Sequence, residues 1–183
     1  MNKTHCVAIS VNGVKIDGKE VYVSVYGKEM LKEIYGSHVR NYPKFHKMDL
    51  LSQLAFIASE LLLEAEGFTR FEECNDRAVI LFGHTASYHA DCIFQTTISD
   101  RNSFFPSPSV FVYTLPNIMV GEIAIRNHYH GETSYIALEN KSLMEQYIEV
   151  YLKAVQPRSV MYGWIDARDD NDFEAELFII NKY

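Results

Sequence analysis

The sequence predicts an α/β protein with a mostly parallel mixed sheet flanked by helices, and three observations favour this class. Segments with strand and helix character alternate after residue 48, as they do in right-handed βαβ units. The run "RAVILFG" at residues 77–83 is continuously apolar and ends in glycine, which is typical of a central strand covered on both faces. Residues 50–66 carry apolar side chains at helical spacing, so they predict a buried helix.

The first third of the chain predicts a small β unit followed by helices. The segments 6–13 and 19–27 have strand character and are joined by a turn around Gly13 to Gly18. A short helix is expected at 28–39, and Pro43 then interrupts the pattern. The helix at 50–66 has Asp49 as its N-cap and Gly67 as its stop. Because this helix is apolar around most of its circumference, it should be buried on more than one side.

The remainder continues the alternation within one domain, residues 1–183. Gly131 is expected to end the helix that begins at Asn117. The expected elements are a helix at 86–99, a loop at 102–109, a strand at 110–114, a helix at 117–131, strands at 134–138 and 159–167, a helix at 142–155 between them, an acidic turn at 166–172 and a last strand at 174–181.

Composition limits the function classes. The net charge of −7 gives no basic face for nucleic acid, and no apolar run reaches the roughly 18 residues that cross a bilayer. The start of the chain lacks the apolar core of a secretory signal. Three cysteines without CxxC spacing argue against zinc and a disulfide framework, so we expect a cytoplasmic protein without a metal or other cofactor.

One Cys/His grouping is a candidate for catalysis. Cys92 lies near His84 and His89 in "GHTASYHADC", just after the predicted strand 77–83. A thiol with a histidine base would be a nucleophile, and ligand sites in α/β folds lie at strand ends. The structural alternative is a small buried thiol on a helix, and this alternative is favoured.

Two further polar groups are interpreted as structural. His128 and His130 are two residues apart, so their side chains diverge on a helix and do not form a metal site with Glu132. The acidic turn at 166–172 lacks the glycine and the terminal glutamate of a calcium loop.

The stretch "VFVYTLPNIMVGEIAI" at 110–125 predicts a strand, a sharp bend at 114–117 and a helix. A nucleophile often sits on such a bend, where the helix N-terminus favours negative charge. Pro116 suits the first helical turn, and Gly121 would let the helix approach a neighbour closely. The bend contains neither cysteine nor serine.

Several of these segments resemble β-ketoacyl synthases. Residues 44–67, "KFHKMDLLSQLAFIASELLLEAEG", are similar to the segment near the start of that family, in which a basic residue and Met-Asp precede a helix ending in glycine. The strand 77–83 resembles the family's next strand, and residues 107–138 resemble its active-site elbow, buried helix and following strand. The likeness extends from about Lys44 to Ala167, most of the chain, and is greatest to short 3-oxoacyl-carrier-protein synthase-like proteins of aryl-polyene and flexirubin-type pigment clusters. It implies a thiolase-like half-fold.

The departures from the family bear on function. In the family a cysteine on the elbow takes the acyl group from a carrier thioester. Matching Thr114 to the family's elbow threonine puts Pro116 at the cysteine position, with Asn117 as the other candidate, and neither can be acylated as a thiolate can. The catalytic histidines and lysine belong to a second half of the thiolase fold, which this chain is too short to contain. We therefore expect a degenerate elbow of Thr114, Leu115, Pro116, Asn117 and Gly121 without catalytic residues.

The resemblance implies a non-catalytic partner of the chain-length-factor type, which acts in fatty-acid or polyketide elongation of the aryl-polyene kind. Its expected partners are an acyl carrier protein, a full-length ketosynthase, or both, in a homo- or heterodimer. A lone half-fold should expose one face of its central helices, so residues 50–65 and 118–125 are the expected partner surface. Two alternatives stay open, namely a thioester-handling or condensing enzyme that uses Cys92 or His89, and a simple acyl- or carrier-binding module.

Overall fold

The computed structural model describes residues 3–21, 23–67 and 76–181, so Cys74 lies outside the described residues. The strands are β1 (His5–Ser10), β2 (Gly13–Ile16), β3 (Lys19–Val21), β4 (Ala78–Gly83), β5 (Thr133–Ala137), β6 (Ser159–Asp169) and β7 (Asp172–Asn181). The α-helices are α1 (Lys28–Ile34), α2 (Leu50–Glu66), α3 (Tyr88–Ile98), α4 (Pro108–Phe111), α5 (Asn117–Asn127) and α6 (Ser142–Ala154). Short helical turns of other types are η1 (Tyr35–Val39), η2 (Pro43–Lys47) and η3 (Val112–Thr114).

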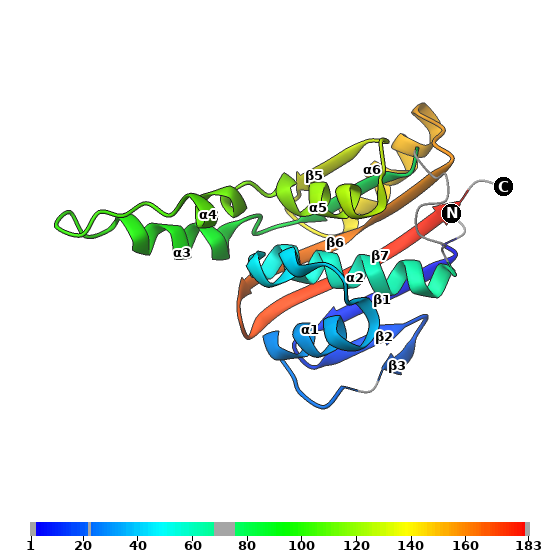
Figure 1. Ribbon diagram of the computed structural model, residues 1–183. Coiled ribbons are helices and arrows are strands. Elements are labelled where there is room, and N and C mark those ends of the chain that lie inside the picture. Colours follow the sequence, from blue (N-terminus) through cyan, green and yellow to red (C-terminus); the bar gives the residue numbers. More distant parts are fainter. Residues whose placement is uncertain (1–2, 22, 68–75, 182–183) are drawn as a thin grey trace.

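The strands form one sheet in the order β3-β2-β1-β7-β6-β4-β5 (Figure 1). Strand β4 is parallel to both β5 and β6, whereas the other four pairings are antiparallel. The mixed α/β class with flanking helices is confirmed, but the prediction that parallel pairing dominates is wrong. Three of these four pairings have a local reason, because short turns join β1, β2 and β3 in succession and also join β6 to β7, and strands joined by short turns pair in antiparallel fashion. The fourth pairs β1 with β7, from opposite ends of the chain. The single strand expected at 19–27 is therefore only β3, and β2 was not foreseen.

Helix α2 is the centre of the molecule and begins and ends as its sequence predicts. The carboxylate of Asp49 accepts a hydrogen bond from the Ser52 amide at 3.1 Å, and Gly67 closes the helix with a φ of 71°. Every residue from Leu50 to Leu63 is buried. The predicted burial on more than one side is thus confirmed.

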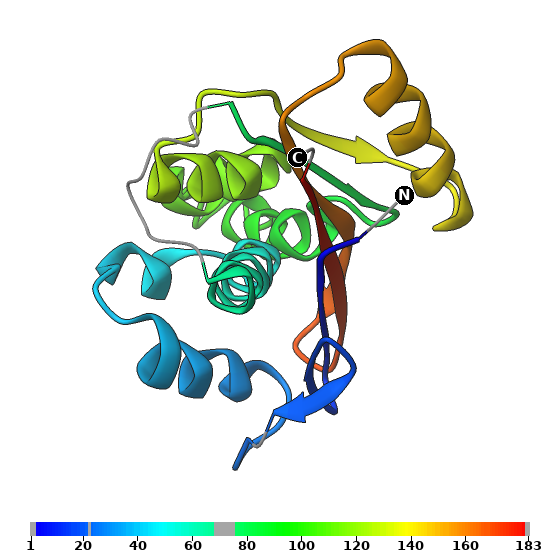
Figure 2. The same cartoon turned by 90° about the vertical axis from the view of Figure 1, so that its right-hand side faces the viewer.

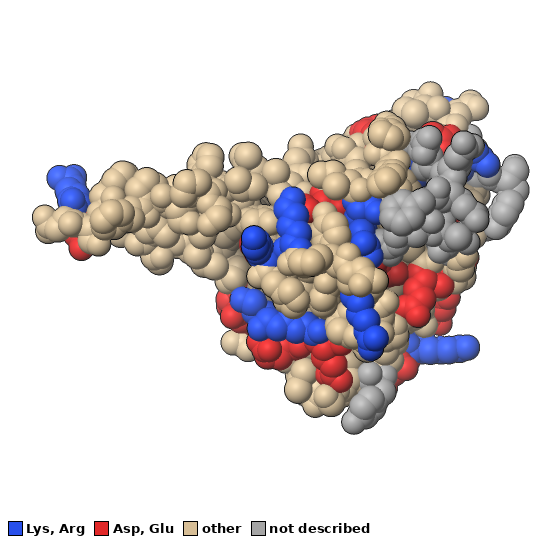
Figure 3. All heavy atoms as spheres, in the orientation of Figure 1, with Lys and Arg blue, Asp and Glu red and all other residues tan. Residues whose placement is uncertain are grey.

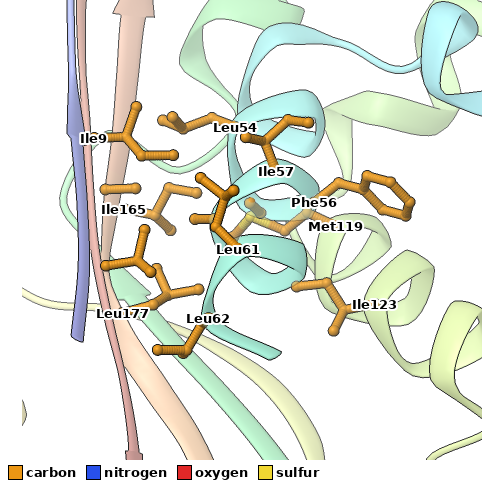
Figure 4. Close-up of a cluster of buried hydrophobic side chains, with 14 of the residues drawn as sticks. Ile9, Leu54, Phe56, Ile57, Leu61, Leu62, Met119, Ile123, Ile165 and Leu177 are labelled. Carbon is orange, nitrogen blue, oxygen red and sulfur yellow. The ribbon is translucent and has the colours of Figure 1, made fainter. Parts of the chain in front are cut away.

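Three layers of side chains enclose α2. On one side Leu54, Leu61 and their neighbours pack on the strands, and on the other side Phe56 faces α5 (Figure 4). Helix α1 and the turns η1 and η2 cover the rest of α2. The expectation that residues 50–65 present a bare partner face is therefore wrong, because elements of the same chain already fill that face. On α5 only Ile125, 64% exposed, presents a large apolar side chain to solvent.

The opposite face of the sheet is covered only in part. Helix α6 packs on β4 and β6 through Met144, Ile148 and Tyr151. Among the elements that the structure describes, no helix lies over β1 to β3 on this side (Figure 2). This uncovered region carries charged pairs, such as Lys141 with Glu176 at 2.5 Å. It also contains a groove of about 760 Å³ with polar and apolar lining. Antiparallel sheets commonly leave one such face in water.

Residues 87–115, here called the arm, project from the body of the molecule (Figure 1). They comprise α3, a returning loop, α4 and η3. The strand predicted at 110–114 is absent, because Val110 and Phe111 belong to α4 and Val112 to Thr114 form η3. A run of β-branched and aromatic residues favours a strand only where a neighbouring strand is available, and here the run folds back onto α3 instead.

Helix α5 ends at Asn127, because His128 adopts a left-handed conformation with a φ of 57°. The predicted stop at Gly131 is three residues too late. Gly131 instead lies against the chain at Asp76 and Arg77, whose carbonyl oxygens would be 2.7 and 2.6 Å from an added Cβ. Within the described ranges no single helix is long and apolar enough to cross a membrane. Only the pair Pro108–Thr114 and Asn117–Asn127, bent by 97°, meets that test, by length and composition alone.

Candidate functional site

The bend predicted to be an elbow joins two helical segments. Thr114 ends η3, its hydroxyl donating to the Phe111 carbonyl at 2.7 Å, and Pro116 precedes the first residue of α5. Asn117 has a structural contact, since its side-chain oxygen accepts a hydrogen bond from the Tyr135 amide of β5 at 2.9 Å. An edge strand with a satisfied amide is less open to further pairing. Leu115 is 52% exposed, and a Cβ added to Gly121 would meet nothing within 4 Å. The close helix approach predicted at Gly121 is therefore wrong.

A strand, a turn and a helix do follow one another further along the chain. Strand β5 ends at Ala137, residues 138–141 form the turn, and α6 begins at Ser142. The turn is held beside β4, since the Leu138 amide donates to the Gly83 carbonyl at 2.9 Å. The residues "LENK" in this turn include no thiol. The elbow geometry therefore lies one strand–helix unit later than predicted, although both of its flanking elements were predicted from the sequence.

The chemistry available at this later turn is limited. Asn140 accepts a hydrogen bond from the hydroxyl of Ser142, and the Nδ1 atom of His84 lies 3.2 Å from the Leu138 carbonyl. A serine nucleophile needs a base within hydrogen-bonding reach. In the part of the chain that the structure describes, no hydrogen bond joins Ser142 to a histidine.

The proposed thiol and histidines do not form a nucleophile–base pair. Cys92 is exposed on α3, so the prediction of a small buried thiol is wrong. Its sulfur contacts Tyr88 one turn earlier and raises the pKa of that phenol. His89, with its side chain 14% exposed, faces Asp170 across 3.9 Å instead. Over the described residues, neither His84 nor His89 is hydrogen bonded to Cys92.

His89 does contribute to an electrostatic cluster at the base of the arm. Burial raises the pKa of the Asp49 carboxyl, whereas hydrogen bonds from Ser52 and from the Leu51 amide, and the electrostatic effect of the nearby His89, lower it. Asp170 is also held by Lys28, whose ammonium lies 3.0 Å from it. No group of three potential metal-ligating side chains occurs in residues 3–21, 23–67 or 76–181.

Sequence reasoning did not find a second charged group, which lies between α2 and α5. Glu122 on α5, with its side chain only 4% exposed, forms an ion pair with Lys44 and accepts a hydrogen bond from the Tyr42 hydroxyl at 3.0 Å. Burial, followed by the bond to Glu122, raises the pKa of Tyr42 to about 12. Glu60 and Arg126 lie 3.6 Å apart nearby. Sequence periodicity places these acids on largely apolar helices but does not identify the loop residues that neutralise them.

The segment 36–48 lies over α2 and has a uniform sign of charge. It contains no acidic residue, and the side chains of Arg40, Lys44 and Lys47 are exposed. Lysine and arginine side chains gather on the face of the molecule shown in Figure 3. A protein with a net charge of −7 therefore presents a local basic surface.

The arm has the opposite character, because it is apolar and largely uncharged. Along its visible face the charged side chains lie only at its tip (Figure 3), where Asp100 and Arg101 occur. Phe104 and Phe105 are 58% and 77% exposed. The other exposed large apolar side chains of the arm are Tyr88, Ile93, Phe111, Val112 and Leu115. Exposed apolar side chains in such number on one segment are typical of interaction surfaces.

The fold is similar to that of solved ketosynthases and chain length factors. The solved ishigamide ketosynthase/chain length factor matches with a TM-score of 0.69 and 16% identity over 98% of this chain and 61% of that one. A ketosynthase in complex with its chain length factor from Xenorhabdus doucetiae matches at 0.65 and 12%, over 99% of this chain and 79% of the other. A type II PKS acyl-carrier protein complex with its ketosynthase bound to the hexaketide matches at 0.61 and 10%, over 98% and 62%.

The chain thus spans about three fifths of the length of the first of these structures. Neither a protein-family model nor a curated protein matches the sequence. At such identities the similarity defines the fold, and the thiolase-like half-fold predicted from the sequence is confirmed.

Proposed function

We propose that this protein is a non-catalytic, chain-length-factor-type partner of an active ketosynthase and acts in the elongation of carrier-bound acyl chains. The observation that carries the proposal is the absence of a thiol from the strand–turn–helix elbow at 138–141 in a ketosynthase-type fold. Without a thiol, this elbow cannot hold an acyl group as a thioester. Elongation of the fatty-acid or polyketide kind, including aryl-polyene synthesis, is the pathway class that the resemblance favours.

The competing enzyme hypothesis depends on Cys92 or His89. Exposure of Cys92 on the arm and its separation from a histidine base argue against an activated nucleophile. A simple acyl- or carrier-binding module is the third possibility, and it would bind its ligand without changing the kinetics of a synthase.

The arm supports a protein partner. Its seven exposed apolar side chains together present on the order of 700 Å², close to the ~800 Å² that each partner buries in a standard interface. Membrane binding would call for many basic residues beside the apolar ones, and the arm has one arginine. A full-length ketosynthase is the proposed partner in a heterodimer, as in the Xenorhabdus doucetiae complex. A homodimer is the alternative.

The basic segment 36–48 supports a second partner, an acidic acyl carrier protein. Opposite charges at the rim of an interface raise the association rate and fix its orientation. Lys44 of this segment forms an ion pair with the buried carboxylate of Glu122, which fixes the position of the lysine side chain. Because the proposed ketosynthase partner acts on carrier-bound acyl chains, we propose a cytoplasmic location for the pair.

The first experiment tests for catalysis. The isolated protein is incubated with acyl and malonyl carrier proteins, and its intact mass is measured. We expect no acyl adduct, and an adduct that disappears in Cys92→Ala or His89→Ala would favour the enzyme hypothesis.

The second experiment tests partnership with a candidate ketosynthase. Co-purification and product length are compared for the wild type, for Phe105→Ser on the arm and for Val150→Ser, a control at a 66% exposed site on α6. We expect only Phe105→Ser to weaken the complex and to alter the product. Identical product length and rate with and without this protein would rule out a partner role.

A further inference from the structure

A carboxylate of β6 lies at the point where the chain leaves the body to enter the arm. One oxygen of Asp166 accepts hydrogen bonds from the amides of His84 and Thr85, both at 2.8 Å, and from the Thr85 hydroxyl at 2.9 Å. Hydrogen bonds to an ionised acceptor are stronger than bonds between neutral groups. Three such hydrogen bonds to one oxygen therefore fix the positions of His84 and Thr85, the two residues that follow β4.

The turn held by Asp166 is sharp and tightly packed. Ala86 has a φ of 49°, a conformation that residues other than glycine adopt at a cost and keep only where their surroundings impose it. Just before it, Gly83 lies so close to β6 that an added Cβ would be 2.1 Å from the Ile165 carbonyl. The path of the chain from β4 to α3 is thus determined by contacts with β6.

Beyond this turn the contacts of the arm with the body become few. The base of α3 is fixed, since Ser87 is buried and its hydroxyl donates to Asp91 at 3.1 Å. His89 lies near Asp170 of the β6–β7 turn. The distal part of the arm extends away from the sheet (Figure 1). A small rotation at the base would therefore move the tip by a large distance.

We infer that Asp166 is a positioning residue, which sets the direction in which the arm leaves the body. The part of this inference that concerns the direction of the arm involves this chain alone. Its consequence, that Asp166 controls the affinity for a partner bound by the arm, rests on the proposed function. A preorganised arm loses less conformational freedom on binding.

The direction of the arm is tested by electron–electron distance measurements on the isolated protein. Spin labels are attached at Asp100→Cys on the arm and Lys153→Cys on α6, two exposed sites, with Cys6, Cys74 and Cys92 replaced by serine. We expect one narrow distance distribution. Asp166→Ala should broaden or shift it, and Asp166→Asn, which keeps an accepting oxygen, should restore it. Asp172→Ala, which removes an exposed pair with Arg168, is the matched control.

Thr85→Ala removes only the hydroxyl donor, and it serves as the milder variant if Asp166→Ala fails to fold. An unchanged distance distribution in a folded Asp166→Ala protein would refute the inference. If Asp166→Ala does not fold, an unchanged distribution in Thr85→Ala would refute it. With a ketosynthase that binds the wild type, Asp166→Ala should weaken the complex about tenfold or more. If no ketosynthase binds the wild type while the distances respond as expected, the proposed function fails and the positioning role stands.

Discussion

At the scale of single residues, two glycines show how packing decides what a position tolerates. Gly83 lies against the Ile165 carbonyl and the Tyr135 hydroxyl, 2.1 and 2.5 Å from an added Cβ, whereas nothing lies within 4 Å of one at Gly121. We expect Gly83→Ala to lower the free energy of unfolding by about 3 kcal/mol. Gly121→Ala, inside α5, should raise it by about 0.5–1 kcal/mol. Urea unfolding of both variants checks this, and equal effects would contradict it.

Asp49 gives a pH-dependent prediction. Burial raises the pKa of its carboxyl above the usual value of 3.8, so the folded chain binds this proton more tightly than the unfolded chain does. The contribution of Asp49 to the free energy of unfolding is therefore greatest below pH 3.8 and falls as pH rises through the folded-state pKa. Asp49→Asn keeps the cap and carries no buried charge, so it should be at least as stable as the wild type at pH 7.

That advantage should vanish below about pH 4, where the wild-type carboxyl is protonated in both states. Thermal unfolding of the two proteins across this range measures it. Asp49→Ala, which loses the cap, should be about 1 kcal/mol less stable than Asp49→Asn. A constant difference between wild type and Asp49→Asn at all pH values would contradict the assignment.

At the scale of elements, the sequence predicts best where the signal is local. The caps Asp49 and Gly67 delimit α2 correctly because their effects reach only one helical turn. The segment 110–114 is predicted wrongly because a strand needs a partner that only the fold supplies. The elbow is displaced for the same reason, since residues 107–117 and 133–142 both offer an apolar run before a helix.

The network around Glu122 also lies beyond sequence reasoning, because it joins α5 to a loop about eighty residues earlier. Glu122→Ala removes the acceptor of Tyr42 and the partner of Lys44, so we expect a loss of about 2–3 kcal/mol in the free energy of unfolding. Glu149→Ala is the matched control, since its pair with Lys153 on α6 is exposed and such pairs contribute about 0.3–0.5 kcal/mol. Chemical denaturation measures the free energy of unfolding of both variants. Comparable losses would show that burial of the Glu122 carboxylate adds nothing to the stability of its contacts.

At the scale of the whole molecule, the carboxylate of Glu66 joins the end of α2 to the start of β4 and to the end of β7. The guanidinium of Arg77, before β4, donates twice to Glu66 at the end of α2, both at 2.8 Å, and Asn181 of β7 donates to the same carboxylate. Arg77→Met leaves that carboxylate, 13% exposed, without its cation. We expect a loss of about 3–5 kcal/mol, measurable as a lower midpoint of thermal unfolding. A midpoint like that of the wild type would show that Glu66 is compensated by other groups.

The alternation of elements and the burial of α2 could be predicted for the whole molecule, but its two most distinctive surfaces could not. The arm depends on a turn fixed by Asp166, which lies 81 residues beyond Thr85 along the chain. The polar face of the sheet depends on the packing of the turn before α6 beside β7, which brings Lys141 next to Glu176. Both result from contacts between segments distant in sequence, and periodicity carries no information about such contacts.

The position of the chain ends has a practical consequence. Lys3 lies just before β1, and its ammonium is 3.5 Å from the centre of the Phe178 ring. Asn181 is the last residue of β7, the neighbour of β1, so both lie at the end of the sheet remote from the arm (Figure 1). A tether fused to either terminus would therefore hold the molecule with its aromatic tip directed outward. Immobilised in this way on a bead or sensor chip, the protein would offer the arm to a passing ligand without steric hindrance from the support.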